Sequence, residues 1–335
     1  MAGSLFFAAR IIFVRRSYAL PKGGEAVARL RGAAALFFPV FFGAALLFFP
    51  DVSAAAAREG VALCLQTVLP SLFPFFVLSS LLVQSDVPRL LSRAMAGVMY
   101  PLFGVSGAGA SALILGLLGG YPVGARTVAE LYGRGEIARE EAEQLLAFCN
   151  NSGPGFFLGV CGTAVFGSAR AGAYLYLIHV GAALVTGILL RRDLGLPRRK
   201  AVSRQRAPFD LAAALPAAVQ SSFAAVGSVS AFVIFFMVLL RLLSLVPALA
   251  ALPPLPRAAL FGFVEMTNGV NALPATRAGF VLCAAIMNWG GLSVQAQTRA
   301  LLAGSALSAR RCVIGKAVQA LAGVPLALLA AQRLF

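Results

Sequence analysis

Long apolar stretches dominate this chain and restrict what it can fold into. A helix needs about 20 apolar residues to cross the hydrocarbon core of a bilayer. Stretches of roughly that length lie near residues 33–49, 61–84, 171–190, 223–246 and 312–331. Charged residues make up 12% of the chain, against about 25% in an ordinary soluble protein, which leaves too little polar surface to cover a soluble globule. The sequence therefore predicts an all-α polytopic membrane protein in contact with the lipid bilayer.

Shorter apolar pieces lie between these stretches, and each ends at a polar or glycine-rich break. They occur near residues 105–118, 144–149, 155–167, 256–264 and 272–288. Irregular backbone at membrane depth is tolerated only inside protein or beside a water-filled cavity. We therefore expect broken or re-entrant helices at these positions.

The basic residues indicate membrane topology rather than nucleic-acid binding. A net charge of +16 would suggest a nucleic-acid partner for a soluble domain, but here the charges lie mainly between apolar stretches, so we expect none. Residues 191–207 contain seven Lys or Arg and one Asp, and the positive-inside rule places them in the cytoplasm with the basic segment 1–31. The predicted divisions are the basic N-terminal segment 1–31, a first transmembrane half 32–190, the basic cytoplasmic linker 191–207 and a second transmembrane half 208–335.

The two halves repeat the same features in the same order. In each half a Leu-Pro step, at Pro70 or at Pro216, leads into a long apolar helix, and two breaks follow. The breaks lie at 119–122 and 150–154 in the first half and at 265–269 and 288–291 in the second. Paired interrupted helices in corresponding positions are typical of transporters whose site lies between the repeats. We expect two structurally similar halves that meet around a polar cavity near the membrane midplane.

The first break, Gly119-Gly120-Tyr121-Pro122, shortly precedes Arg126. A helix that starts after this break would point unpaired N–H groups and its positive end into the gap, which favours an anion. Gly120, Tyr121 and Arg126 are therefore candidate substrate-binding residues. A tight turn at the membrane surface, with Arg126 reaching the head groups, is the alternative.

The second break interrupts an apolar helix with Asn150, Asn151 and Ser152. Amide groups are costly in hydrocarbon unless they face protein, water or ligand. These three residues are therefore candidates for substrate binding, and we expect them to face the breaks of the second half. A helix cap followed by an exposed hairpin is the alternative.

The third break contains Glu265, the only acidic residue after Asp210. An ionisable side chain directly after an apolar run indicates function, here the carriage of a coupled proton, the binding of a cation or a hydrogen bond from substrate. Glu265, Thr267 and Asn268 join the candidate set. A carboxylate at the membrane interface is the alternative.

The fourth break is Asn288 with Trp289-Gly290-Gly291, and Ser293, Gln295 and Gln297 follow it. An unwound segment would turn these last three side chains to one side, whereas a helix would spread them over two faces. Asn288, Ser293 and Gln297 complete the set of candidate substrate-binding residues.

The remaining polar residues indicate no catalytic or metal site. We expect the acidic cluster in 133–146 to be the solvated face of a helix outside the membrane. We expect His179 to be packed or pore-facing. The cysteines form no CxxC pair, so we expect them to be packing residues. Gly104-Val105-Ser106-Gly107 with His179 resembles the Ser/His dyad of rhomboid proteases, but the match is short and leaves the paired breaks unexplained. We therefore expect no enzyme, no metal, and no cofactor beyond a coupling proton or cation.

Five segments of the chain carry a family resemblance. They are LPSLFPFFVLSSLL, GGYPVGARTVAELYGRGEI, EAEQLLAFCNNSGPGFFLG, EMTNG and GGLSVQAQ. In this order they resemble the YlbJ-type sporulation integral membrane proteins, also called SpoVV. These belong to the wider nucleoside-recognition or Gate-domain membrane proteins, which are related to concentrative nucleoside transporters. The resemblance covers roughly residues 60 to 330 and leaves about the first 30 unmatched.

This resemblance implies a function in an endospore-forming bacterium. The family moves dipicolinic acid, a small aromatic dianion, across the outer forespore membrane during sporulation. Helix N-termini and Arg126 would suit its carboxylates, and Tyr121 or Trp289 its ring. A nucleoside or other small-molecule permease and a non-transporting membrane scaffold for spore assembly stay open, and so does an oligomer.

Overall fold

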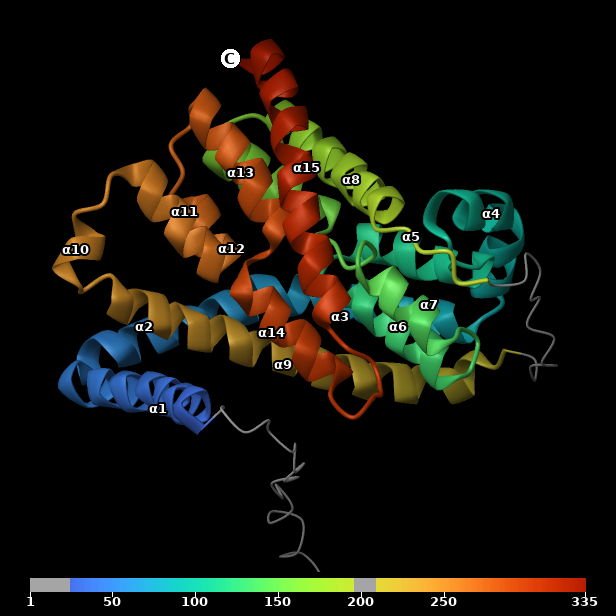
Figure 1. Ribbon diagram of the computed structural model, residues 1–335, viewed down its shortest axis with the longest axis horizontal. Helices are drawn as coiled ribbons and strands as arrows, with labels where there is room; N and C mark the ends of the chain where they lie inside the picture. The colour runs from blue at the N-terminus through green and yellow to red at the C-terminus, as the bar shows by residue number, and fades with distance from the viewer. Residues whose placement is uncertain (1–24, 196–208) are drawn as a thin grey trace, which may run out of the picture. The chain divides into compact units, whose positions relative to one another are not determined.

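The computed structural model describes residues 25–195 and 209–335, which contain helices and no strand (Figure 1). Most of the N-terminal segment 1–31 and residues 196–207 of the basic linker lie outside the described residues. The chain forms two compact units, Met1–Pro50 and Asp51–Phe335. The first contains one described helix, α1 (Glu25–Phe48), which includes most of the predicted stretch 33–49. The second contains all four breaks.

The first half of the sequence continues from α1 with a series of mostly short helices. These are α2 (Pro50–Leu63), the π-helical turn η1 (Cys64–Val68), α3 (Leu69–Gln84), α4 (Val87–Phe103), the 3₁₀ turn η2 (Gly107–Gly109), α5 (Ala110–Gly119), α6 (Val123–Gly133), α7 (Arg139–Leu146), the π-helical η3 (Phe156–Val165) and α8 (Ala169–Leu189). Gly104 ends α4 in the left-handed conformation, and Ser168 starts α8 by accepting a hydrogen bond from Ala171 N, so local sequence sets these ends.

The second half begins with the longest helix and then breaks up in the same manner. Its helices are α9 (Leu211–Leu243), α10 (Pro247–Ala250), α11 (Pro254–Val264), α12 (Met266–Asn271), α13 (Arg277–Trp289), α14 (Gly291–Leu302) and α15 (Arg310–Leu334). Asp210 caps α9, and Thr276 caps α13. Side-chain caps of this kind satisfy the backbone N–H groups that a helix start leaves unpaired.

The two halves share one order of elements. The helix at the Leu-Pro step (α3 or α9) is followed, after one further helix (α4 or α10), by short helices around a first break (α5 and α6, or α11 and α12). Helices around a second break and a final long helix (α8 or α15) come next. Matching helices also pack together, α3 against α9 and α8 against α15, with α13 beside α15 (Figure 1). The predicted fold class, an all-α protein of two similar halves with broken helices, is confirmed.

Four helical segments among the described residues are long and apolar enough to cross a bilayer. They are Ala169–Leu189, Leu211–Leu243, Arg277–Leu302 and Arg310–Leu334, and two bent helix pairs raise the number to as many as six. One such pair joins Val87–Phe103 to Gly107–Gly119 with a bend of 102°. The piece predicted at 272–288 is thus part of a longer candidate span that continues through Gly290 and Gly291. The stretch 61–84 is divided by η1, and Leu72–Gln84 alone is shorter than a span.

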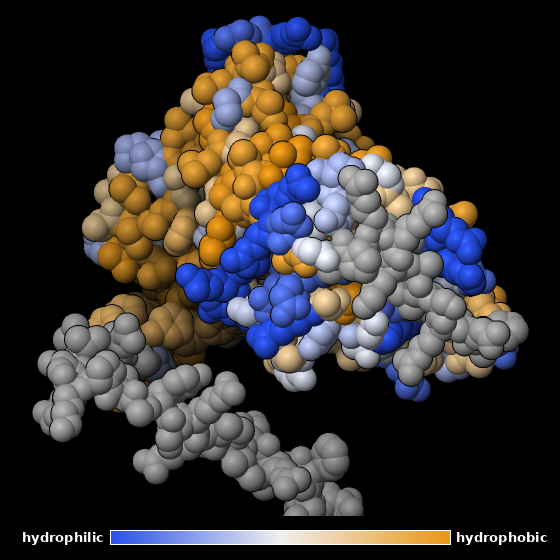
Figure 2. Space-filling view, turned by 45° about the vertical axis from the view of Figure 1, so that its right-hand side comes forward, coloured by the Kyte–Doolittle hydropathy of each residue, from blue (hydrophilic) through white to orange (hydrophobic). Residues whose placement is uncertain are grey.

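Large apolar side chains stay exposed along the long helices. Leu177 and Leu189 on α8 and Leu321 and Leu329 on α15 are among them. Figure 2 shows broad apolar areas on the face it presents, beside patches of hydrophilic residues. Extended apolar surface marks contact with a membrane or a partner protein, which agrees with helices that face lipid.

One prediction about the acidic cluster in 133–146 is wrong. Glu140 is exposed as expected, but Glu141 is buried and its carboxylate accepts a hydrogen bond of 2.7 Å from Ser106 N. Because α7 is amphipathic, Glu141 and Leu145 lie on its inner face, one helical turn apart. Burial raises the pKa of the Glu141 carboxyl, and the hydrogen bonds from Ser106 oppose this rise.

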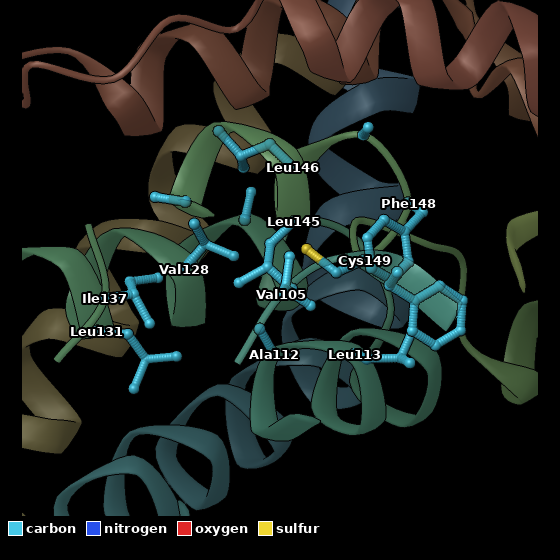
Figure 3. Packing of buried hydrophobic residues seen from close by; sticks show 14 of the residues in the cluster. Val105, Ala112, Leu113, Val128, Leu131, Ile137, Leu145, Leu146, Phe148 and Cys149 are labelled. Atoms are coloured by element: carbon cyan, nitrogen blue, oxygen red, sulfur yellow. The ribbon is translucent and has the colours of Figure 1, made fainter. Parts of the chain in front are cut away.

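A hydrophobic core lies around α4 to α7 and positions the second break. Val105, Leu113, Val128, Leu145 and Phe148 are among its buried members (Figure 3). Cys149 is the last buried member of this core in the first half, and Leu302, Leu307 and Cys312 join it from the second half, so the break at 150–154 directly follows a packed residue. A rigid core of this kind holds the polar side chains that follow it in defined positions.

Candidate functional site

Glycines on three helices hold the backbone of the second break in place. A Cβ atom at Gly116 on α5 or at Gly124 on α6 would overlap the carbonyl oxygen of Cys149. A Cβ at Gly315 on α15 would likewise overlap the carbonyl oxygen of Ala147. Only glycine permits such close backbone approach. Helices α5 and α6 of the first half and α15 of the second half therefore pack directly against the segment that precedes Asn150.

Asn151 is the first centre of a buried polar network. Its side chain has no exposed surface, and its Oδ1 accepts hydrogen bonds from Lys316 Nζ at 3.1 Å and from Gln319 Nε2 at 3.0 Å. Its Nδ2 donates to the carbonyl of Phe148 at 2.8 Å. Asn151 therefore joins the break of the first half to α15.

Gln319 extends the network to the fourth break. Its Nε2 lies 3.0 Å from Asn288 Oδ1, and its Oε1 accepts a hydrogen bond of 2.8 Å from Lys316 Nζ. Asn288 Nδ2 donates to Ala284 O at 2.8 Å. Gly323 leaves room for this amide, since a Cβ there would overlap Asn288 Nδ2. The predicted proximity of Asn151 and Asn288 is confirmed, with Gln319 between them.

Two further contacts fix the first and last residues of the Asn-Asn-Ser sequence. Asn150 Nδ2 donates to Thr298 Oγ1 on α14 at 3.0 Å. Ser152 N donates to His179 Nε2 on α8 at 3.1 Å, so this ring nitrogen acts as an acceptor and the hydrogen of the neutral ring is assigned to Nδ1. His179 is packed, as expected, and it also positions the second break.

Lys316 is the only charged residue among those that the sequence analysis missed; Thr298 and Gln319 are the others in this network. The Lys316 side chain is completely buried, and among the described residues it forms no ion pair. Its ammonium lies 5.1 Å from the centre of the Tyr121 ring, within cation–π distance. The sequence could have identified Lys316, because it is the only charged residue in the stretch 312–331. A lone charge in an apolar span indicates function.

The first break lies against the same buried polar network. Tyr121 is buried, and its hydroxyl lies 3.5 Å from the carbonyl of Met287. A Cβ at Gly120 would lie 3.0 Å from Gly153 N, and a Cβ at Gly290 would lie 3.0 Å from the Tyr121 hydroxyl. The first break therefore touches both the second and the fourth. We call the following residues the central polar cluster: Tyr121, Asn150, Asn151, Ser152, His179, Asn288, Thr298, Lys316 and Gln319.

Glu265 lies beside this cluster but has its own partners. Its carboxylate accepts hydrogen bonds from Thr267 N at 3.1 Å and from Asn268 N and Asn268 Nδ2, each at 2.8 Å. It thus caps α12. A Cβ at Gly291 would lie 3.2 Å from Glu265 Cα, so the third break packs against the fourth. Together these contacts bring all four breaks next to one another, as the repeat predicts.

Arg126 is engaged away from the central polar cluster. Its guanidinium donates to Glu130 Oε1 at 3.0 Å on its own helix and to Ser221 Oγ at 2.8 Å on α9. Its side chain is nearly buried, and a weaker contact reaches Ser222 Oγ at 3.4 Å. The charge that the sequence suggests for an anion therefore already has an acidic partner.

The residues after the fourth break form the helix α14 rather than an unwound segment. Ser293, Gln295 and Gln297 are nevertheless all buried. Gln295 Nε2 donates to Trp289 O at 3.2 Å, and Ser293 Oγ has no hydrogen-bond partner among the described residues. Trp289 stacks on Phe263 with a ring distance of 5.2 Å, so it joins α13 to α11.

Comparisons with known proteins agree with this architecture. Residues 65–240, more than half of the chain, match the Gate family, which is described as nucleoside recognition. The sporulation integral membrane protein YlbJ of Bacillus subtilis (strain 168) is 30% identical over 302 residues, covering 79% of this chain and 74% of that protein. No solved structure matches the chain.

Proposed function

The chain belongs to the Gate family of nucleoside-recognition membrane proteins, together with the YlbJ-type sporulation proteins, and on this premise we propose that it transports a small anionic metabolite during sporulation. The favoured substrate is dipicolinic acid, and the favoured location is the outer forespore membrane of an endospore-forming bacterium. In this proposal the chain is not an enzyme, and it needs no metal or cofactor beyond a coupling proton or cation.

The convergence of the four breaks on the central polar cluster is the observation that carries this proposal. Buried amides and charges are costly, and a purely structural helix contact is generally at least as stable with apolar residues in their place. Here Asn150, Asn151, Asn288 and Gln319 are all buried at one place between the halves. Sites at the meeting of broken helices are typical of secondary transporters.

The chemistry of the cluster suits a small aromatic dianion. Lys316 offers a positive charge, the amide groups can present N–H or C=O to polar edges, and the Tyr121 ring offers an aromatic face. Glu265 lies one break away and would repel a dianion when ionised, which is why we propose that it takes up the coupling proton.

Two other functions compete with this one. The family description favours a nucleoside, whose ring and hydroxyl groups the same amides could bind. A membrane scaffold for spore assembly would use the breaks only for packing.

Uptake into vesicles tests the proposal. The purified full-length protein is reconstituted, and the uptake of dipicolinate and of uridine is measured side by side. We expect saturable uptake of dipicolinate that protein-free vesicles lack. Uptake of uridine alone would identify a nucleoside permease, and uptake of neither would favour the scaffold.

A further inference from the structure

Lys316 carries a buried positive charge with only neutral partners. An ammonium has three N–H donors, and the acceptors around Nζ are Asn151 Oδ1 at 3.1 Å and Gln319 Oε1 at 2.8 Å. Tyr121 contributes the face of its ring at 5.1 Å. Among the described residues no carboxylate pairs with it. Buried charges are usually paired with an opposite charge, so the arrangement around Lys316 lacks a negatively charged partner.

Both acceptors of Lys316 can be exchanged. Each is an amide oxygen, and an amide presents two N–H donors when its oxygen turns away. A carboxylate that entered here would accept hydrogen bonds from Lys316 and from the amides of Asn151 and Gln319. Charge-assisted hydrogen bonds of this kind are stronger than the neutral ones they replace.

Arg126 cannot fill this role in the arrangement observed. Its guanidinium is held by Glu130 at 3.0 Å and by Ser221 at 2.8 Å, whereas Lys316 lies where the breaks meet.

We propose that Lys316 is the counter-charge that binds the carboxylate of an anionic aromatic substrate, with the Tyr121 ring beside the substrate ring. This inference rests on the transport function proposed above and identifies its anion site.

The same contacts suggest how binding would affect the two halves. In the structure, Lys316 and Gln319 hold Asn151, so α15 of the second half is tied to the second break of the first half. A carboxylate that takes the place of Asn151 Oδ1 on Lys316 would break one of these two hydrogen bonds and leave Gln319 as the remaining link. Occupancy of the site would then alter the contact between the halves, as alternating access requires.

A charge-removing variant tests the assignment. Binding of pyridine-2,6-dicarboxylate and of its neutral diamide to the purified full-length protein is measured in detergent, for the parent and for Lys316→Gln. We expect Lys316→Gln to bind the dicarboxylate more weakly by about tenfold or more, the effect of losing a hydrogen bond to a charged group, and to lose its preference over the diamide. Arg310→Gln removes an exposed charge from the same helix and should bind like the parent.

A second variant covers the case in which Lys316→Gln does not fold. Asn151→Asp places a carboxylate at the position that now lies 3.1 Å from Lys316 Nζ, at the cost of the hydrogen bond to Phe148 O. This built-in partner should abolish dicarboxylate binding and spare the diamide. A folded Lys316→Gln or Asn151→Asp protein that binds the dicarboxylate like the parent overturns the role of Lys316. Failure of the parent to take up any carboxylate into vesicles would refute the transport proposal instead.

Discussion

Glu265 combines two possible tasks in one side chain. It accepts three hydrogen bonds from Thr267 and Asn268, so it stabilises the start of α12, and it lies at the break that packs on Gly291. A carboxylate at a helix start is favoured when it is charged. Its protonation would therefore weaken the cap of α12 at the same time as it removed a charge near the proposed substrate site.

We expect Glu265→Gln to permit substrate binding and to abolish the dependence of transport on external pH. Glutamine resembles the protonated carboxyl in shape and keeps one acceptor oxygen for Asn268, but it cannot release a proton. Uptake of dipicolinate into vesicles is measured from acidic to alkaline external pH. An unchanged pH profile, with only the loss of thermal stability of about 1 kcal/mol that a weakened cap predicts, would leave Glu265 as a structural cap.

Individual polar residues were partly predictable from the sequence. Asn151 and Asn288 were identified because they interrupt apolar runs, and the structure brings them to one place through Gln319. Lys316 was missed although it is the only charged residue in the stretch 312–331, and Gln319 was missed because nothing in the apolar sequence of α15 shows that it lies on the buried side. In such a helix the sequence does not show which face turns inward, and only packing decides it.

Among the elements, α15 needs a glycine at position 315 to pack against α7. Gly315→Ala should lower the melting temperature of the purified protein, because the new Cβ would overlap the carbonyl oxygen of Ala147, which backbone packing holds in place. We expect a loss of roughly 1–3 kcal/mol, as for other overpacked cores. Gly181→Ala on α8 is the control, since its Cβ would meet Leu326 at an ordinary 3.6 Å. Equal stability of the two variants would show that α15 can shift away from α7.

Helix α7 gives the structure a pH-dependent component of stability. Burial raises the pKa of Glu141 above its ordinary value of 4.5, so the folded protein binds this proton more tightly than the unfolded chain does. The stabilisation is complete below pH 4.5 and declines as the pH rises through the higher pKa of the folded state. Glu141→Gln should remove this decline, so the melting temperature of the variant should rise relative to that of the parent as the pH is raised from below the ordinary value of 4.5 to above the higher pKa of the folded state. A constant difference across that range would contradict the assignment.

Element boundaries were predictable where local chemistry sets them and less so elsewhere. Asp210, Ser168 and Thr276 start helices as N-caps, and Gly290 ends α13 in the left-handed conformation. The continuation from α13 into α14 as one candidate span was not foreseen. Two glycines in sequence predict a break, but the direction of the helix beyond it depends on packing against Glu265 and Met266.

At the scale of the whole molecule, the order of features was predictable and their contacts were not. The spacing of the breaks in each half predicted two similar halves. Helix α3 packs on α9, and α8 packs on α15, because their apolar surfaces fit together. The sequence of one half does not show which helix of the other half it will contact. The meeting of the breaks was predictable only because interrupted helices occur at corresponding positions in both halves.

If the halves move during transport, a covalent link between them should stop it. A Cβ at Gly60 on α2 would lie 3.5 Å from Ile234 Cβ on α9, within the range that a disulfide bridges. We expect the double variant Gly60→Cys with Ile234→Cys to lose dipicolinate uptake on oxidation and to regain it on reduction. The two single variants, treated alike, control for the native cysteines and should keep their uptake. A cross-linked protein that transports at the rate of the reduced one would show that α2 and α9 move together, and alternating access would then have to arise within each half.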